Sequence, residues 1–344
     1  MKPTSTPSTV SSTPTLPRPS PDLEIPIDNV LSQRFDDMLA RLTVRPIIND
    51  RRGQLKEIID LGVTFKDIPG PIFFSSRIQP QEDICYVAAQ LCWYAKGRQR
   101  LDGVETYRPK MWKRMTDSLA TRQTDVDPRL DLNSNYGEYV FKEGQLDLAI
   151  TRLHKDPMTR QAVILLNRPS VLISDTQDHV CTTSLQFLIR DGKLHCIATM
   201  RSNELWDGFR YDVAFFTFLM DYVRAELSAK GRTGIVLGDY IHNVGSFHCY
   251  TQDSLSIKCS SDLEGLAFVF PQLNLGEGPA LVKELPHLEQ LIKAMAGQPS
   301  KGLSVMCDTD SRDGWKHYHT IVNLLFHAAK RINQKDLAHG PRIL

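Results

Sequence analysis

Residues 181–212 read CTTSLQFLIRDGKLHCIATMRSNELWDGFRYD, and this stretch carries the clearest pattern in the chain. Two runs within it, Ser184–Arg190 and Lys193–Met200, are rich in residues that favour β-strands. The runs are joined across Asp191-Gly192, a dipeptide typical of a tight hairpin turn. The stretch therefore predicts a β-hairpin within a larger sheet.

Further strands and helices are predicted on both sides of this hairpin. Ala162–Leu166 (AVILL) has the composition of another strand, and Val213 to about Leu227 has the spacing and length of a long buried helix. Upstream, apolar residues recur along one face of a helix that we expect to end near Gly97, namely Ile84, Val87, Ala88, Leu91 and Cys92. Strands mixed with long helices indicate an α/β or α+β domain built on one sizeable sheet.

The composition is that of a globular protein of 344 residues without a strong charge bias. Its 41 Lys and Arg residues nearly balance 40 Asp and Glu residues, so any phosphate recognition must be local. The seven cysteines form no CxxC pair, so we expect reduced thiols in a cytoplasmic protein and no metal site. The longest apolar stretch, Tyr211–Met220, is too short and too charged to span a membrane.

Residues 1–25 differ from the rest of the chain because Pro, Ser and Thr dominate them. Such a segment has too few apolar side chains to offset the entropy of ordering, so we expect a disordered tail. An organelle transit peptide is the alternative, although Lys2 and Arg18 are sparse positive charge and no amphipathic face is present. Residues 26–344 would then form a single catalytic domain.

Three features of residues 181–212 could carry chemistry. Cys181 is a candidate nucleophile, the pair Arg201-Ser202 ends a strand, and Asp212 opens the long helix. Taken alone, a cysteine before a strand is more often a small buried apolar residue, and an acidic residue at a helix start is often a cap. Their mutual spacing is more specific than any of them alone.

This spacing closely resembles the thymidylate synthase family, whose pattern is a nucleophilic Cys, QF, RS, a Gly, a base-reading residue and then HxY. Here these positions are Cys181, Gln186-Phe187, Arg201-Ser202, Gly208, Asp212, and His248 with Tyr250. Weaker similarity extends outward to the phosphate loop Asn49-Asp50-Arg51 with Gly53, the helix segment Trp93–Gly97, the segment Asn135-Tyr136-Gly137 and the strand Asp156–Asn167.

The resemblance implies a large mixed β-sheet covered by long helices, and a homodimer that packs sheet to sheet. In such a dimer Arg160 would reach the nucleotide phosphate in the neighbouring subunit. Within one subunit the resemblance assigns the nucleotide phosphate to Arg51, Arg201 and Ser202. It assigns the base to Gly208 and Asp212, and the sugar 3′-hydroxyl to His248 and Tyr250.

A cysteine is needed because C5 of a pyrimidine is a poor nucleophile. Thiolate attack at C6 makes C5 enamine-like, so that it can capture the one-carbon unit of 5,10-methylenetetrahydrofolate, the co-substrate that the resemblance implies. A free thiol is mostly protonated at neutral pH, and Arg201 is the candidate group for favouring the thiolate. The resemblance assigns folate contacts to Glu204 and Trp112.

Asp212 stands where thymidylate synthases place an Asn, whose amide matches O4 and N3–H of uracil. Cytosine reverses these edges, and an ionised Asp can accept from its amino group. The exchange therefore predicts CMP or dCMP as substrate and, by resemblance to the deoxycytidylate and cytidylate hydroxymethylases, a 5-hydroxymethyltransferase. A C5-methylating synthase acting on a uracil nucleotide is the alternative.

The sequence departs from the family at Gln90, where the resemblance places a Glu that relays protons. Gln cannot act as an acid or base, which leaves three alternatives. The alignment of this helix with the family is shifted, or Tyr136 or a water molecule carries out the proton transfer. Otherwise the protein is a non-catalytic nucleotide- or RNA-binding relative. The family's C-terminal segment, which closes over folate, has no recognisable counterpart. Its lack favours addition of water over hydride transfer, and hence hydroxymethylation.

Overall fold

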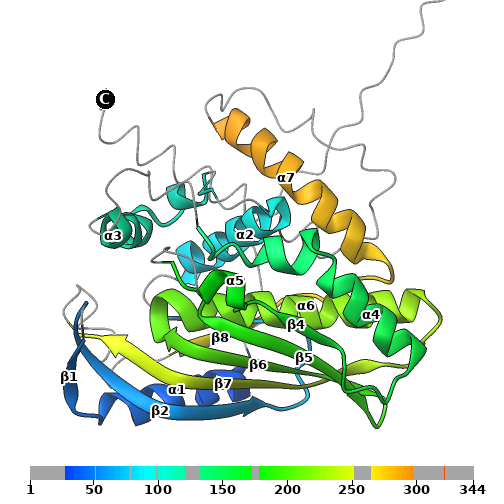
Figure 1. The fold of residues 1–344 in the computed structure, drawn as a ribbon, viewed down its shortest axis with the longest axis horizontal. Coiled ribbons are helices and arrows are strands. Elements are labelled where there is room, and N and C mark those ends of the chain that lie inside the picture. The colour runs from blue at the N-terminus through cyan, green and yellow to red at the C-terminus, as the bar shows by residue number, and fades with distance from the viewer. Residues whose placement is uncertain are drawn as a thin grey trace, which may run out of the picture.

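A computed structural model describes residues 28–296 except 51, 77–79, 98–99, 102, 121–131, 173–177 and 252–264, together with residue 321. Within these ranges one sheet has the strand order β1-β2-β7-β6-β5-β4 (Figure 1). Its strands are β1 (Ile47–Asp50), β2 (Gly53–Phe65), β4 (Val163–Leu165), β5 (Thr182–Arg190), β6 (Lys193–Glu204) and β7 (Val236–Tyr250). A second sheet pairs β3 (Ile72–Ser76) with β8 (Gly265–Val269).

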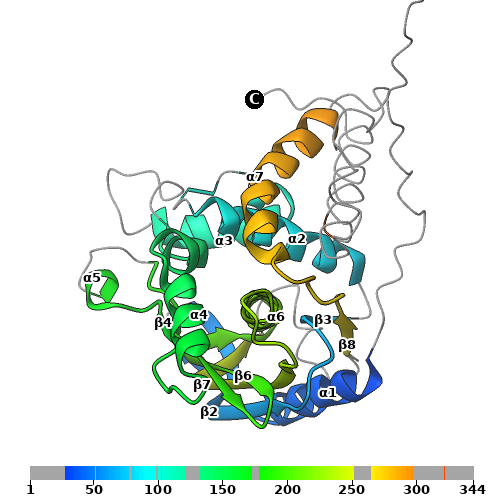
Figure 2. The same ribbon diagram turned by 90° about the vertical axis from the view of Figure 1, so that its right-hand side faces the viewer.

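One long helix, α6 (Arg210–Ala229), lies between the large sheet and an outer layer of helices (Figure 2). It contacts β6 and β7 on one side and α2, α4 and α7 on the other. The remaining helices are α1 (Asn29–Thr43), α2 (Pro80–Lys96), α3 (Pro109–Ala120), α4 (Gln145–Lys155), α5 (Pro169–Leu172) and α7 (Glu277–Ala296). Three short helical turns are η1 (Val104–Thr106), η2 (Glu138–Lys142) and η3 (Leu205–Phe209).

The predicted hairpin is formed by β5 and β6. Arg190 pairs with Lys193, and the two turn residues Asp191 and Gly192 have φ angles of 50° and 74°. Positive φ at both central positions is the backbone of a type I′ turn, which matches the twist of the two strands. The Asp-Gly prediction is therefore confirmed.

The sheet is mixed because β6 and β7 run parallel while its other neighbouring strands are antiparallel. Parallel neighbours need a long crossover connection, and α6 supplies it. The chain leaves β6 at Glu204, passes through η3 and enters α6 at Arg210. The last residues of β6 and the first turn of α6 are thereby held close together, and the candidate site is built there.

The predicted elements differ from the observed ones mainly at their ends. The strand expected at Ala162–Leu166 spans Val163–Leu165, and the helix expected from Val213 begins earlier, at Arg210. The amphipathic helix ends at Lys96, next to Gly97, whose φ is 56°. The tail 1–25 and the C-terminal segment that would meet folate lie outside the described residues, apart from residue 321.

Among the described cysteines, Cys249 departs from the expectation of reduced thiols. It is disulfide-bonded, whereas Cys181 and Cys196 are free thiols. The expectation of reduced thiols throughout is therefore wrong for Cys249. Cys181, the candidate nucleophile, keeps a free thiol.

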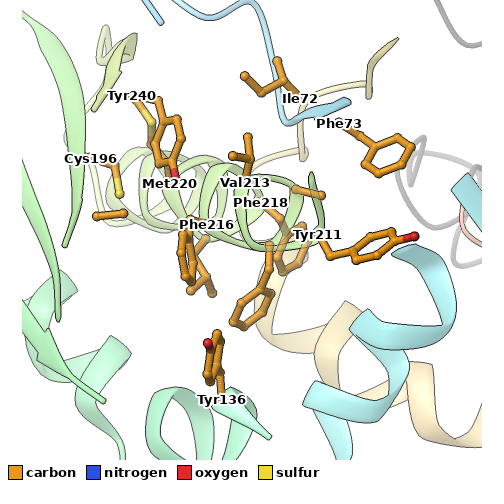
Figure 3. Packing of buried hydrophobic residues seen from close by; sticks show 14 of the residues in the cluster. Ile72, Phe73, Tyr136, Cys196, Tyr211, Val213, Phe216, Phe218, Met220 and Tyr240 are labelled. Atoms are coloured by element: carbon orange, nitrogen blue, oxygen red, sulfur yellow. The ribbon is translucent and has the colours of Figure 1, made fainter. Parts of the chain in front are cut away.

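Helix α6 forms the centre of the core, since every residue from Arg210 to Ser228 is buried. A helix that is buried all round must be apolar on most of its faces, as this one is. Figure 3 shows its Phe216 beside Tyr136, and the two rings stack with centroids 6.1 Å apart. On another side Tyr211 meets Tyr86 of α2 edge-to-face at 4.6 Å.

The start of α6 is tied to α2 by a buried ion pair between Arg210 and Asp83. Asp83 also accepts hydrogen bonds from Arg108 (2.5 Å), from the hydroxyl of Ser75 (2.8 Å) and from Tyr211 (3.2 Å). Although burial acts against the charged form, the two arginines hold the pKa of Asp83 below its usual value. Both charges are thus compensated inside the core.

Replacing Asp83 with Ala should be strongly destabilising, because the Arg210 guanidinium would stay buried without a counter-charge. We expect the free energy of unfolding to fall by about 3 kcal/mol, measured by urea denaturation followed by circular dichroism. Asp117→Ala removes the carboxylate of the exposed Lys113–Asp117 pair and should change little. Equal urea midpoints for Asp83→Ala and the wild type would show that the pair does not stabilise the start of α6.

Candidate active site

The thiol of Cys181 lies half-buried directly before β5, and its main-chain carbonyl accepts from the amide of Arg201 on β6 (2.9 Å). Burial raises the pKa of the thiol to about 11, and the negative charges of Asp212 and Asp178 act in the same direction. Arg201 and Arg52 oppose this rise. The positive charge of Arg201 thus acts in favour of the thiolate, but burial outweighs it.

The guanidinium of Arg201 also supports the segment that leads to Cys181. Its Nε donates to the carbonyl of Val180 (3.1 Å) and its Nη2 to the carbonyl of His179 (2.7 Å). The side chain is otherwise exposed, so a charged guanidinium faces solvent beside the thiol. Ser202, the next residue, is half-buried and pairs with Ser246 across the parallel strands β6 and β7.

Asp212 is buried in the first turn of α6, and its Oδ2 accepts from Nδ2 of Asn203 (2.7 Å). Burial raises the pKa of Asp212 to about 7, although the Asn203 hydrogen bond lowers it. Gly208 lies against this pair: a Cβ added there would approach Nδ2 of Asn203 to 2.8 Å and Oδ2 of Asp212 to 3.7 Å. A glycine at 208 therefore leaves room for the Asn203–Asp212 contact.

Tyr136 joins this group from the loop before η2. Burial raises the pKa of Tyr136 well above the usual value of 10.0, and the negative charges of Asp212 and Cys181 raise it further. The same loop is fixed to α2, because Asn135 donates to the carbonyl of Trp93 (2.9 Å) and Gly137 packs directly on the backbone of Tyr94. Tyr136 thus stays protonated and within electrostatic reach of both candidate catalytic groups.

His248 and Tyr250 lie on β7 with their rings edge-to-face at 5.3 Å. The hydroxyl of Tyr250 donates to Asp50 (2.9 Å) in the turn between β1 and β2, where Asp50 also accepts from the amides of Arg52 (2.7 Å) and Gly53 (3.0 Å). Burial lowers the pKa of His248, so its ring is neutral. The predicted sugar-binding pair therefore contacts the predicted phosphate loop.

Arg51, predicted as the phosphate ligand of that loop, lies outside the described residues. The adjacent Arg52 is described, and its charge acts on Cys181, His248 and Tyr250. Sequence reasoning missed Arg52 because the resemblance pointed to one arginine of the pair. Two consecutive basic residues at the tip of a tight turn were the available signal.

Asp178 is another residue that sequence reasoning missed, as is Asn203, the partner of Asp212. The carboxylate of Asp178 accepts from the amide (2.8 Å) and the hydroxyl of Ser134, and its carbonyl accepts from Asn133 (3.1 Å). Burial nevertheless raises its pKa. Asp178 lies three residues before Cys181, so these hydrogen bonds hold the segment that leads to the nucleophile. Its negative charge also raises the pKa of the Cys181 thiol.

Four predicted site residues lie at the edge of this cluster or apart from it. Gln90 lines an apolar cavity between α2 and α6 and donates to the hydroxyl of Tyr94 (3.1 Å), whose ring stacks on Tyr136. Trp112 is buried edge-to-face against Trp93. Glu204 caps η3 through the amides of Trp206 and Asp207, and Arg160 is exposed. Among the described contacts, none joins Gln90 or Arg160 directly to Cys181.

Comparison with known proteins decides the family. A family model described as thymidylate synthase matches residues 82–296. The chain belongs to the thymidylate synthase family. It is 30% identical over 175 residues to the deoxycytidylate 5-hydroxymethyltransferase of Enterobacteria phage T4, covering 48% of this chain and 67% of the relative.

Two other members of the thymidylate synthase family match at lower identity. The deoxyuridylate hydroxymethyltransferase of Bacillus phage SP01 is 26% identical over 242 residues, covering 68% of this chain and 60% of the relative. The thymidylate synthase of Staphylococcus haemolyticus is 25% identical over 159 residues, covering 44% and 47%. The family, the fold and the class of enzyme, a one-carbon transferase acting on C5 of a pyrimidine nucleotide, are thereby confirmed.

In the described part of the chain, no helix is both long and apolar enough to cross a bilayer. Nor do the His, Cys, Asp and Glu side chains of that part form a group of three or more that could hold a metal ion.

Gly208→Ala tests the packing around the thymidylate synthase family's base-reading position. The added methyl group would displace the Asn203 amide from Asp212, so we expect pyrimidine nucleotide affinity to fall about 10-fold, by the loss of one buried hydrogen bond to a carboxylate. Isothermal titration calorimetry measures this. Gly62→Ala is the matched control, because its Cβ would meet only the Asn243 side chain at 3.3 Å. Unchanged affinity in Gly208→Ala would show that the contact is not needed for binding.

Proposed function

We propose that this enzyme is a cytidylate or deoxycytidylate 5-hydroxymethyltransferase that uses 5,10-methylenetetrahydrofolate and water. The observation that carries the proposal is the state of Asp212. Its carboxylate is buried at the base-reading position and its Oδ2 accepts from the Asn203 amide. Deoxycytidylate 5-hydroxymethyltransferase is also the name of the relative matched at 30% identity, which supports the same substrate class.

A carboxylate at this position suits cytosine better than uracil. Cytosine presents an amino donor at N4 and an acceptor at N3, whereas uracil presents an acceptor at O4 and a donor at N3. An ionised Asp212 accepts from N4, and a proton shared between the carboxylate and N3 completes the pair. The pKa of about 7 places Asp212 where that proton can be shared at neutral pH.

Cys181 is the nucleophile of the proposed reaction. Its thiolate adds to C6 of the base, and C5 takes up the one-carbon unit, which is still bound to the folate. Loss of the C5 proton breaks the carbon–nitrogen bond to tetrahydrofolate, which leaves, and water adds to the resulting exocyclic methylene as the thiolate is eliminated from C6. The phosphate is bound by Arg201 and Ser202, with Arg51 of the adjoining turn. His248 and Tyr250 hydrogen-bond the sugar.

Proton transfer falls to Tyr136 or to a water, because Gln90 cannot donate or accept a proton as an acid or base. Tyr136 lies within electrostatic reach of Cys181 and Asp212, and its raised pKa keeps the hydroxyl protonated as a donor. Gln90 acts on this group through Tyr94, whose ring stacks on Tyr136 with centroids 5.6 Å apart. Gln90 therefore supports the position of Tyr136 instead of reacting itself.

The donor set beside the base fits a folate. Glu204 directly follows Asn203, pairs with His248 across β6 and β7, and is half-buried. A carboxylate there can accept from the amino and N–H groups of a pterin. Trp112, which is buried edge-to-face against Trp93, is the second residue assigned to the folate in this proposal. When bound, methylenetetrahydrofolate supplies a one-carbon unit at the oxidation level of formaldehyde.

The proposed active enzyme is a homodimer formed sheet to sheet. The strands β5 and β6 alternate between buried residues, which face α6, and half-buried or exposed residues on the other face. A second copy packed on that face would cover it and bring the exposed Arg160 toward the phosphate of the neighbouring site. Residues 26–344 would form one catalytic domain behind the tail 1–25, in a cytoplasmic protein.

Cys181→Ala should abolish both product formation and exchange of the C5 hydrogen with solvent, while nucleotide binding persists. Wild type incubated with CMP, dCMP, UMP or dUMP and methylenetetrahydrofolate should yield a nucleotide heavier by CH₂O, detected by mass spectrometry, without forming dihydrofolate. Undiminished C5 exchange in Cys181→Ala would remove the thiol from the mechanism. A methylated product with stoichiometric dihydrofolate would instead favour a methylating synthase, and no turnover would favour a non-catalytic relative.

Asp212→Asn should shift the preference from cytosine toward uracil nucleotides, since the amide restores the donor and acceptor that uracil requires. A mismatched buried donor or acceptor costs roughly 1–3 kcal/mol, equivalent to about 5- to 150-fold in the ratio of kcat/KM values. Steady-state rates with CMP and UMP give this ratio. A wild-type protein that already prefers UMP would contradict the role given to Asp212.

A further inference from the structure

A chain of buried polar side chains leads away from Asp212 into the sheet. Asn203 of β6 donates to Asp212, Nε2 of His242 on β7 lies 3.0 Å from Oδ1 of Asn203, and the hydroxyl of Tyr240 lies 2.6 Å from Nδ1 of His242. Three of these groups are 3% exposed or less, the exception being Asp212 at 7%. The covalent steps described above use none of the three residues behind Asp212.

Only one direction of hydrogen bonding is consistent with an ionised Asp212. Burial lowers the pKa of His242 to about 3, so the ring is neutral and carries a single N–H. A carboxylate accepts only, so Asn203 must turn its NH₂ toward Asp212 and its carbonyl toward His242. His242 then donates from Nε2, and Nδ1 accepts from the hydroxyl of Tyr240.

The opposite direction would require a protonated Asp212. Asn203 would be flipped, its carbonyl would accept from the Asp212 hydroxyl, and the His242 proton would move to Nδ1. With its hydroxyl turned toward Asn203, a protonated Asp212 has only a neutral carbonyl oxygen left for the base, which is a weaker acceptor for N4 of cytosine than a carboxylate. The direction of this hydrogen-bond chain therefore determines how strongly Asp212 accepts from cytosine.

The surrounding packing holds the rings of the chain in place. His242 meets Phe209 edge-to-face with centroids 4.9 Å apart, and Tyr240 stacks on Phe65 at 6.1 Å. Gly208 packs against Asn203, since an added Cβ would lie 2.8 Å from its amide nitrogen. Apolar side chains at positions 203, 240 and 242 would be enough to stabilise the core, so the polar residues found there point to another role.

We infer that Tyr240 and His242 are positioning residues that set base specificity, because they fix the Asn203 amide with its donor toward Asp212. They keep Asp212 as an acceptor for the amino group of cytosine. This inference rests on the proposed function, since it assigns the base that Asp212 reads. It adds a second layer of residues, on β7, to the specificity of the site.

Four variants of the full-length protein test the chain. His242→Leu removes the donor to Asn203, whereas His242→Gln keeps an amide donor in a similar place. Tyr240→Phe removes only the hydroxyl that holds the His242 proton on Nε2. Cys196→Ala is the matched control, because Cys196 pairs with Tyr240 across β6 and β7 but makes no part of the chain.

The readouts are the ratio of kcat/KM for CMP and UMP, the same ratio for dCMP and dUMP, and the Kd of each nucleotide by calorimetry. We expect the cytosine-to-uracil ratio to fall about 10-fold in His242→Leu and by less in Tyr240→Phe, since one directed buried hydrogen bond is lost. His242→Gln and Cys196→Ala should stay within about 2-fold of wild type. Thermal denaturation checks that each variant is folded.

The outcomes for the chain and for the proposed function can be told apart. An unchanged ratio in folded His242→Leu, or in Tyr240→Phe if the leucine variant does not fold, overturns the role of the chain. An equal fall in Cys196→Ala overturns it too, because general loosening of the core would then suffice. A wild-type preference for UMP overturns the cytosine assignment instead. The role of the hydrogen-bond chain is then decided by whether the cytosine-to-uracil ratio of kcat/KM falls in the His242 and Tyr240 variants relative to wild type.

Discussion

The structure depends on burying the polar start of an otherwise apolar helix. Helix α6 is enclosed by the sheet and by α2, α4 and α7, yet its first turn contains Arg210 and Asp212. Buried charges persist only where partners compensate them. Arg210 has the carboxylate of Asp83, whereas Asp212 has one amide from Asn203. The uneven compensation keeps the Arg210 guanidinium charged, whereas burial raises the pKa of Asp212 to about 7.

The parallel pairing of β6 with β7 explains why the site forms at this end of the sheet. The crossover returns through α6, so the residues that end β6, the turn η3 and the start of α6 share one corner. The hairpin partner β5 brings Cys181 to the same corner, because Cys181 lies beside Arg201. Cys181 and the continuous stretch from the end of β6 through η3 to the start of α6 thereby meet at one corner. Catalytic groups in such sheets are held by main-chain pairing instead of by long flexible side chains.

Much of this could be predicted from the sequence, and the failures have physical reasons. The Asp191-Gly192 hairpin and the helical spacing of α6 are local signals, and both elements are present. The grouping of Cys181, Arg201 and Asp212 came from the family resemblance, and in the structure the charges of Arg201 and Asp212 act on Cys181. His242 and Asp178 gave no local signal, because a buried polar residue in an apolar strand acquires its meaning only from partners on other strands. The sequence also could not predict that the pKa of Cys181 is raised, since the burial that raises it depends on the whole fold.

The pKa values of Cys181 and Asp212 are coupled, because the negative charge of Asp212 raises the pKa of the Cys181 thiol. A thiol pKa of about 11 leaves Cys181 almost entirely protonated at neutral pH, and the Asp212 carboxylate is part of the cause. In the proposed function, a single proton serves Asp212 and N3 of the bound cytosine together, so the pair is neutral whichever atom holds it. The field that opposes the thiolate would then weaken when cytosine is in place. A uracil nucleotide brings no such acceptor at N3, so on this proposal recognition of cytosine and activation of Cys181 depend on the same proton.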